Sequence, residues 1–286
     1  MIKQHLARAY KSISVVVPSA DRAPFFKSLM IRPDRDLVFV RVPKAGCSTV
    51  IARLIDMPPE ATENTQRLHA RNSLVTFDNS KFVARLRQLS EDSTTLFAVV
   101  RNPLTRVLSA FREKIELQID GPRYRQEFGI ALDALVSFEE FVDLLVQRDP
   151  LTLDMHFMPQ SLILRPDLVR YKHLFHLETG MTECLRWLDD YLNHSGVGAE
   201  ALVAPHATNA SSLAKNVYST KILEIVAKYY ADDFRYFGYA PDLEDLSPRL
   251  ALQMPGNTAV RALSMGAFNT MDSRLRGLMP MLLHRH

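Results

Sequence analysis

A short apolar stretch followed by a tight turn and a helical pattern occurs twice in this chain. This repeated unit constrains the fold more than any other feature. The first unit joins residues 37–42 (LVFVRV) to a helical pattern at 49–57, and the second joins 94–100 (TTLFAVV) to one at 103–117. Short β-branched runs are typical of buried strands. Because a further helix is expected between the units, at 81–89, the pattern predicts an α/β fold with a parallel sheet flanked by helices.

Further elements follow the second unit. Ser137 precedes Glu140 by three positions at the start of an apolar helical pattern, which is the signature of a capping box. The remaining patterns predict a strand at 171–177 and helices at 137–147, 179–192 and 212–237.

The chain divides by composition into three parts. We expect an N-terminal extension at 1–36, a main domain at 37–240, and a helical, basic, methionine-rich C-terminal extension at 241–286. Amphipathic helices in this tail are expected to pack against the main domain or against a second subunit in a homodimer. Attachment to an anionic membrane surface is the alternative.

Charge and cysteine content limit the partners and the cellular location expected for the protein. A net charge of +3 fits a small polyanionic ligand but is too weak to indicate nucleic acid as a partner. The two cysteines cannot build a disulfide framework, and no apolar run reaches the roughly 18 to 20 residues of a membrane span. These features predict a cytoplasmic location, with peripheral contact at the inner membrane face as an option for the tail.

The first turn has the composition of an anion site. It places Lys44 and Gly46 between a strand and the start of a helix, and Ser48 and Thr49 add hydroxyls. Free backbone N–H groups and the helix dipole favour negative charge at such a position. The lysine precedes the glycine, so this turn is not the phosphate loop of nucleoside triphosphatases, in which the lysine follows it.

The second turn repeats this chemistry. Arg101 follows the second strand, and Ser109 lies eight residues later, about two helical turns on. A guanidinium with a nearby hydroxyl suits a phosphate monoester. Two such elements after neighbouring strands predict a ligand with two separated anionic groups.

Two segments of the chain resemble the motifs of a known family. The segment VPKAGCST (42–49) is similar to the 5′-phosphosulfate loop of sulfotransferases that use 3′-phosphoadenosine-5′-phosphosulfate (PAPS), and VRNPLTRVLSAFREK (100–114) to their 3′-phosphate motif. The variants AGCS and SAFREK most resemble the carbohydrate group known as sulfotransferase family 2. Residues 38–239 share that group's order of motifs.

The resemblance implies a fold and a reaction. The fold would be a three-layer sandwich like that of P-loop nucleoside triphosphatases. The reaction would be metal-free, in-line transfer of the sulfuryl group of PAPS to a hydroxyl of a carbohydrate or glycolipid, with adenosine 3′,5′-bisphosphate as product. The implied contacts to the phosphosulfate come from Lys44, Ala45, Gly46, Cys47, Ser48 and Thr49, and those to the 3′-phosphate from Arg101 and Ser109.

The catalytic base stays open among several residues. His69 follows the first unit, where some relatives place a catalytic histidine, and His156 is the second choice. An imidazole titrates in the useful range. Glu113 and Glu116 are further candidates, and Arg106 and Arg112 are candidates for cofactor or acceptor contacts.

Other features bear on the acceptor and on the source. Val50 stands where many relatives have an aromatic residue, so the group that stacks on adenine is not identified. Residues 118–129, with Arg123 and Arg125, would line an acidic-glycan cleft or form a solvated loop. The lack of a membrane anchor favours a bacterial protein. The alternatives in function are a nucleotide kinase of P-loop type and a non-catalytic protein that binds PAPS or a glycan.

Overall fold

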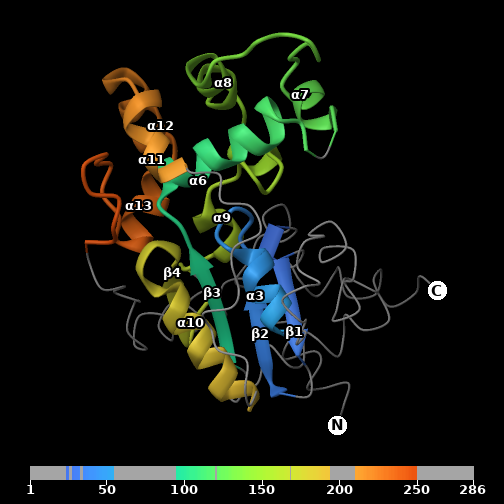
Figure 1. Cartoon of the computed structure of the whole chain (residues 1–286), viewed down its shortest axis with the longest axis vertical. Helices are drawn as coiled ribbons and strands as arrows, with labels where there is room; N and C mark the ends of the chain where they lie inside the picture. The colour runs from blue at the N-terminus through green and yellow to red at the C-terminus, as the bar shows by residue number, and fades with distance from the viewer. Residues whose placement is uncertain are drawn as a thin grey trace, which may run out of the picture.

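The computed structural model describes residues 24–25, 28–32, 35–54, 95–119, 121–167, 169–193 and 210–249 (Figure 1). The expected helix at 81–89, His69 and nearly all of the C-terminal extension lie outside these residues. Within the described part, no helix is both long and apolar enough to cross a membrane.

A four-stranded sheet organises the described residues, in the order β1-β2-β3-β4. Its strands are β1 (Leu29–Arg32), β2 (Leu37–Val40), β3 (Thr95–Val100) and β4 (His173–His176). The pairs β2–β3 and β3–β4 are parallel, which confirms the α/β prediction. The pair β1–β2 is antiparallel, so the sheet is mixed. The sequence patterns did not predict β1, which lies before the expected domain start at residue 37.

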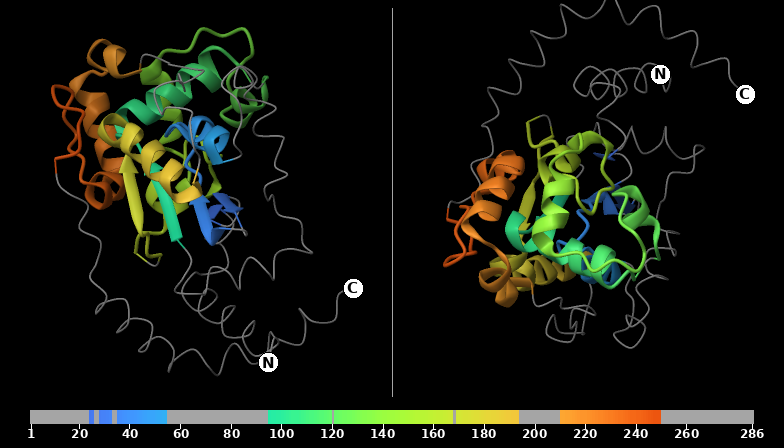
Figure 2. Two further views of the ribbon diagram at one scale, coloured as in Figure 1. Left: turned by 60° about the horizontal axis from the view of Figure 1, so that its bottom comes forward. Right: turned by 90° about the horizontal axis from the view of Figure 1, so that it is seen from above.

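Helices cover both faces of the sheet because the side chains of its strands alternate. Val38, Val40 and Ala98 face one apolar core, with helices α6 (Pro103–Ala110), α8 (Phe138–Leu145), α9 (Gln160–Leu164), α11 (Ala210–Val217), α12 (Thr220–Tyr229) and α13 (Ala231–Phe237). Phe39 and Phe97 face the other core, with α3 (Cys47–Leu54) and α10 (Leu177–Leu192). Figure 2 shows α3 (light blue) and α10 (yellow) together on one side of the sheet. The result is three layers.

Several helices differ in detail from their predictions. The Asn102 side chain accepts from the Leu104 N–H at 2.9 Å and caps α6, as the proline at the first helical position favours. The helix expected over 103–117 is α-helical in its first half, α6, and continues as a π-helix, η4 (Phe111–Glu116). The single helix expected at 212–237 is three, because Ser219 caps a new start at α12 and Tyr230 marks the boundary with α13. The capping box of α8 is confirmed in both its hydrogen bonds.

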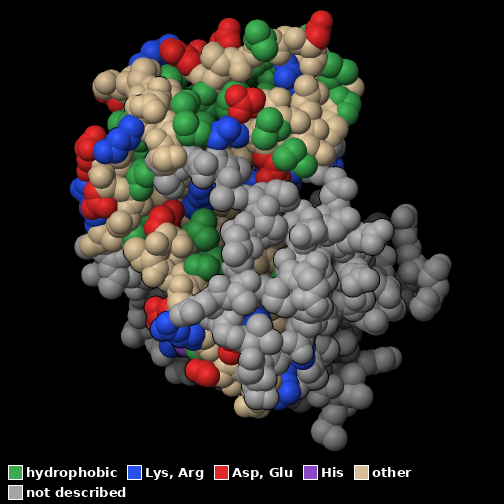
Figure 3. Space-filling view, in the orientation of Figure 1, with side chains coloured by type: hydrophobic (Ala, Val, Ile, Leu, Met, Phe, Trp, Pro, Cys, Tyr) green, Lys and Arg blue, Asp and Glu red, His purple; other side chains and the backbone are tan. Residues whose placement is uncertain are grey.

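The segment between η4 and α8 adds a small helix, α7 (Arg123–Glu127), and a 3₁₀ turn, η5 (Pro150–Thr152), precedes α9. The face seen in Figure 3 mixes acidic, basic and apolar side chains over the described residues.

The edge of the sheet at which β2, β3 and β4 end brings the two predicted turns together. Because these strands are parallel, their carboxyl ends meet there, and the turns at 43–46 and 101–102 emerge side by side.

Candidate active site

The turn after β2 has a backbone shaped for an anion. Lys44 and Gly46 both have left-handed backbone angles, with φ of 70° and 73°. The Val50 N–H donates to the Gly46 carbonyl at 3.3 Å, so the N–H groups of residues 46–49 precede the hydrogen-bond ladder of α3. A left-handed lysine is strained, and such strain gathers at functional sites.

Glycine is required at position 46 for two reasons. An alanine there would be strained by the left-handed φ. Its methyl group would also overlap the Met181 side chain and lie 3.0 Å from Leu177 Cδ1, both on α10. The turn is therefore packed tightly against the first turns of α10.

Arg101 ties the two predicted turns together. Its guanidinium donates to the Lys44 carbonyl at 3.0 Å and to Thr105 Oγ1 at 3.0 Å. The Gln160 side chain holds the Arg101 backbone at both its N–H (3.0 Å) and its carbonyl (2.8 Å). Burial lowers the pKa of Arg101 to about 10, opposed by Glu178, so the guanidinium stays charged at neutral pH.

Arg106, a candidate for cofactor or acceptor contacts, has a structural role instead. Its side chain is 1% exposed and donates to three backbone carbonyls: Pro43 at 2.9 Å, Met155 at 2.8 Å and Met158 at 2.8 Å. Pro43 belongs to the turn after β2, whereas the two methionines flank His156. The guanidinium therefore fixes the first turn relative to the histidine.

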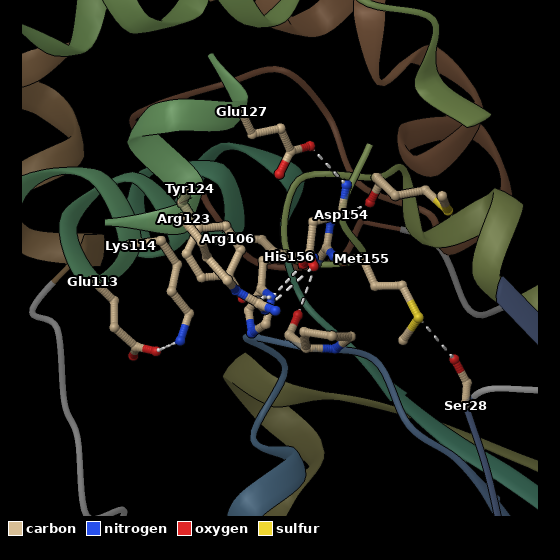
Figure 4. Close-up of polar contacts among 12 residues, drawn as sticks. Ser28, Arg106, Glu113, Lys114, Arg123, Tyr124, Glu127, Asp154, Met155 and His156 are labelled. Carbon is tan, nitrogen blue, oxygen red and sulfur yellow. Dashed lines mark hydrogen bonds and ion pairs between the residues drawn. The ribbon is translucent and has the colours of Figure 1, made fainter. Parts of the chain in front are cut away.

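A carboxylate lies between two lysines next to the turn. Glu113 on η4 is paired with Lys44 through Oε2. It is also paired with Lys114 Nζ at 2.6 Å through Oε1 (Figure 4). Burial lowers the pKa of the Lys44 ammonium, and the Glu113 carboxylate opposes this. Burial would raise the pKa of Glu113, but the two ammonium groups outweigh it and bring that pKa to about 2.

His156 belongs to a second cluster beside the first (Figure 4). Its Nδ1 lies 2.6 Å from Asp154 Oδ1 and 3.2 Å from the Tyr124 hydroxyl, to which Arg123 donates. Because a carboxylate only accepts, Nδ1 carries the proton and Nε2 keeps its lone pair in the neutral ring. Burial lowers the pKa of His156 below 6.5, opposed by the hydrogen bond to Asp154.

The two clusters share one electrostatic environment. The charges of both Lys44 and Lys114 contribute to the lowered pKa of His156. Burial would raise the pKa of Asp154, but its contacts with His156 bring it to about 2, so this carboxylate is ionised at neutral pH. The site thus combines fixed cations with a neutral imidazole, a set of groups suited to moving an anionic group onto a hydroxyl.

The predicted residues fall into three groups. The cradle residues Lys44 to Thr49 and Arg101 come together at the sheet edge, with Ala45, Cys47 and Thr49 buried and Ser48 half-buried. Ser109 is buried in α6. His69 lies outside the described residues, and Glu116 is half-exposed, paired with Arg112 at 3.2 Å.

Some residues of the site were not found from the sequence. Asp154, two positions before His156, was not singled out, and the structure pairs its carboxylate with His156 Nδ1 at 2.6 Å. Tyr124 gave no signal. Arg125, expected in a cleft or a solvated loop, is buried and donates to the carbonyls of Ile115, Ala131 and Ala134. Arg123 is 63% exposed and lies 3.5 Å from Asp154.

The fold and site define an α/β protein with paired cationic turns at the carboxyl edge of a largely parallel sheet. Residues 27–240 match the sulfotransferase family, so this chain belongs to that family of enzymes. It is 31% identical over 166 residues to carbohydrate sulfotransferase 8 of Mus musculus, covering 50% of this chain and 38% of that protein.

Two further relatives are more distant. Carbohydrate sulfotransferase 14 of Homo sapiens is 25% identical over 199 residues (60% of this chain, 49% of that protein). Carbohydrate sulfotransferase 9 of Homo sapiens is 26% identical over 173 residues (53% and 38%). The chain therefore spans less than half the length of these relatives. No solved structure matches it.

Replacing Arg106 with lysine should lower the stability of the protein. A single ammonium cannot reach the three carbonyls of Pro43, Met155 and Met158, so buried acceptors lose their partners. We expect a loss of about 2–4 kcal/mol in the free energy of unfolding, measured in urea. Arg112→Lys, at a 29% exposed position, should change it by less than about 0.5 kcal/mol. Equal changes in the two variants would contradict the structural role of Arg106.

Proposed function

We propose that this sulfotransferase uses PAPS as its donor and transfers the sulfuryl group to a hydroxyl of a carbohydrate or glycolipid acceptor. The observation that supports the proposal is the contact between Arg101 and the Lys44 carbonyl, which joins the turn after β2 to the turn after β3 at one edge of the sheet. The carbohydrate part is supported by the relatives, which are carbohydrate sulfotransferases. We further propose that the three layers form a P-loop-like sandwich, with residues 37–240 as the catalytic domain.

The residues at the sheet edge fit such a donor. The amides of residues 45–49, the hydroxyls of Ser48 and Thr49, and the Lys44 ammonium would hold its 5′-phosphosulfate. Arg101 and Ser109 would hold its 3′-phosphate. When bound, PAPS supplies the sulfuryl group and leaves as adenosine 3′,5′-bisphosphate.

Lys44 is proposed to act by electrostatic stabilisation. Its side chain is 11% exposed, so its ammonium acts in a partly desolvated site where charge interactions are stronger than in water. Negative charge develops on the bridging oxygen as the sulfur–oxygen bond breaks. In the complex with the donor, a cation beside that oxygen would lower the barrier by stabilising this charge.

His156 is proposed as the base, ahead of His69 and Glu113. Its Nε2 would take the proton of the acceptor hydroxyl while that oxygen bonds to sulfur, and Asp154 would stabilise the imidazolium that forms. A carboxylate with a pKa near 2, as in Glu113, is a poor proton acceptor at neutral pH. No described residue other than His156 combines an imidazole with the neighbourhood of Lys44.

Arg123 is proposed to contact the acceptor, because it is largely exposed beside the proposed base. The cytoplasmic location, the homodimer and the membrane contact of the tail remain proposals from the sequence alone.

A transfer assay tests the function. With PAPS labelled in its sulfate, the wild-type protein should move label onto at least one member of a panel of polysaccharides and glycolipids. Lys44→Ala should lower this rate at least about 100-fold through loss of transition-state stabilisation. Lys221→Ala, at a 64% exposed position on α12, is the matched control and should keep the wild-type rate. Wild-type rates in Lys44→Ala would remove this lysine from the mechanism.

The pH dependence of kcat/KM tests the base. Since the neutral imidazole is the active form, the rate should rise with pH to a plateau through a midpoint below 6.5. Asp154 raises the pKa of His156, so Asp154→Asn should move this midpoint to lower pH and also reduce the plateau. His156→Gln should lower kcat by about 10²–10⁴ with unchanged affinity for adenosine 3′,5′-bisphosphate. An unaffected rate in His156→Gln would move the role to His69 or to a glutamate.

A further inference from the structure

The Glu113 carboxylate forms an ion pair with the Lys44 ammonium, the group proposed to stabilise the transition state. Its oxygens are divided between two lysines: Oε2 pairs with Lys44, and Oε1 pairs with Lys114 at 2.6 Å. The three side chains are 13%, 11% and 4% exposed, respectively, so water screens these pairs only weakly. Lys44 therefore meets any incoming anion while already engaged with a carboxylate.

Releasing Lys44 leaves Glu113 with a partner. A buried carboxylate that loses its only cation is costly. Here Lys114 continues to compensate the charge on Glu113 after Lys44 turns away. An anion with more than one negative charge competes well for Lys44, because Glu113 offers one charge shared between two cations. The arrangement permits an exchange of partners at small energetic cost.

The position of Glu113 on its helix links this exchange to the second turn. Helix α6 runs directly into the π-helix η4, so Ser109 and Glu113 are four residues apart on one continuous helical segment. Single π-helical turns within helices are frequently found at functional sites. The segment proposed to hold the 3′-phosphate thus also carries the partner of Lys44.

We propose that Glu113 is a positioning residue that holds Lys44 charged and withdrawn in the nucleotide-free protein and gives it up to the 5′-phosphate group of the bound nucleotide. This inference rests on the proposed function. Its physical basis is that Glu113 opposes the effect of burial on Lys44, whose ammonium would otherwise be compensated poorly. Among the described residues, Lys114 from η4 and Cys47 from α3 also act on the pKa of Lys44. The Lys44 charge in turn acts on the pKa of His156, in the loop before α9.

The test is calorimetric titration of the Glu113→Gln variant with two nucleotides at pH 6.5. Adenosine 3′,5′-bisphosphate carries the 5′-phosphate, and adenosine 3′-monophosphate lacks it. Without the competing carboxylate, the variant should bind the bisphosphate about tenfold more tightly than the wild type does. Its affinity for the monophosphate should be unchanged. A general effect of the substitution on folding would not distinguish the two nucleotides.

The pH dependence gives a second measurement. Because the carboxylate that keeps Lys44 protonated is gone, the affinity of Glu113→Gln for the bisphosphate should begin to fall at a lower pH than that of the wild type. Glu113→Asp, which keeps the charge on a shorter side chain, should behave in between and serves if Glu113→Gln does not fold. Glu116→Gln, three residues on and 51% exposed, is the matched control and should bind both nucleotides as the wild type does.

Two results would overturn the inference. If Glu113→Gln binds the bisphosphate no more tightly than the wild type, or tightens both nucleotides equally, Glu113 does not restrain Lys44. If the wild-type protein binds neither nucleotide, the proposed function fails together with the inference.

Discussion

The hydrogen bond from the Arg101 guanidinium to the Lys44 carbonyl is the contact on which the site depends. It joins the turn after β2 to the turn after β3, and Gln160 fixes the Arg101 backbone from α9. Gln160 is anchored in turn, since the buried Asp233 on α13 accepts from its N–H at 2.8 Å and from the Ser161 N–H at 2.7 Å. A parallel sheet brings the strand ends together, and these polar contacts set the spacing of the turns.

Buried arginines take two different parts in this edge of the protein. The Arg106 guanidinium donates to three carbonyls and so joins the first turn to the loop around His156. Arg101 makes one such contact and one with a hydroxyl, and its charge lies close to Glu178, which also accepts from the Tyr239 hydroxyl at 2.6 Å. This network holds the two guanidinium groups at the sheet edge, where burial reduces screening of their charge by water. Weakly screened cations favour the binding of a polyanion.

Local patterns predicted much of this architecture. The apolar runs at β2 and β3 and the capping box of α8 were found because strand burial and helix capping depend on neighbouring residues. The π-helix at η4 was missed, since tertiary packing decides it. The start of α12 was also missed, although its cap is local: the Ser219 hydroxyl accepts from the Ile222 N–H at 3.3 Å. The strand β1 was missed because no helical pattern follows it, as one follows β2, β3 and β4.

Site residues in the turns after strands could be predicted from the sequence. Site residues whose partners lie far away in the chain could not. Lys44, Gly46 and Arg101 were found because each follows a recognisable strand. The roles of Arg106 and Arg125 were not, since a buried arginine that donates to carbonyls cannot be told from a surface arginine by its neighbours in the sequence. The same holds for Glu113, whose pairing with Lys44 spans 69 residues.

The central claim is that the two turns hold the two ends of one nucleotide, and nucleotide binding tests it most directly. Calorimetric titration of the wild type and of Arg101→Ala should be done with adenosine 3′,5′-bisphosphate and with adenosine 5′-monophosphate, which lacks the 3′-phosphate. We expect Arg101→Ala to weaken binding of the bisphosphate about tenfold more than binding of the monophosphate, whose smaller loss reflects the missing contact with the Lys44 carbonyl. Equal losses for the two nucleotides, or no binding of the bisphosphate by the wild type, would contradict the account.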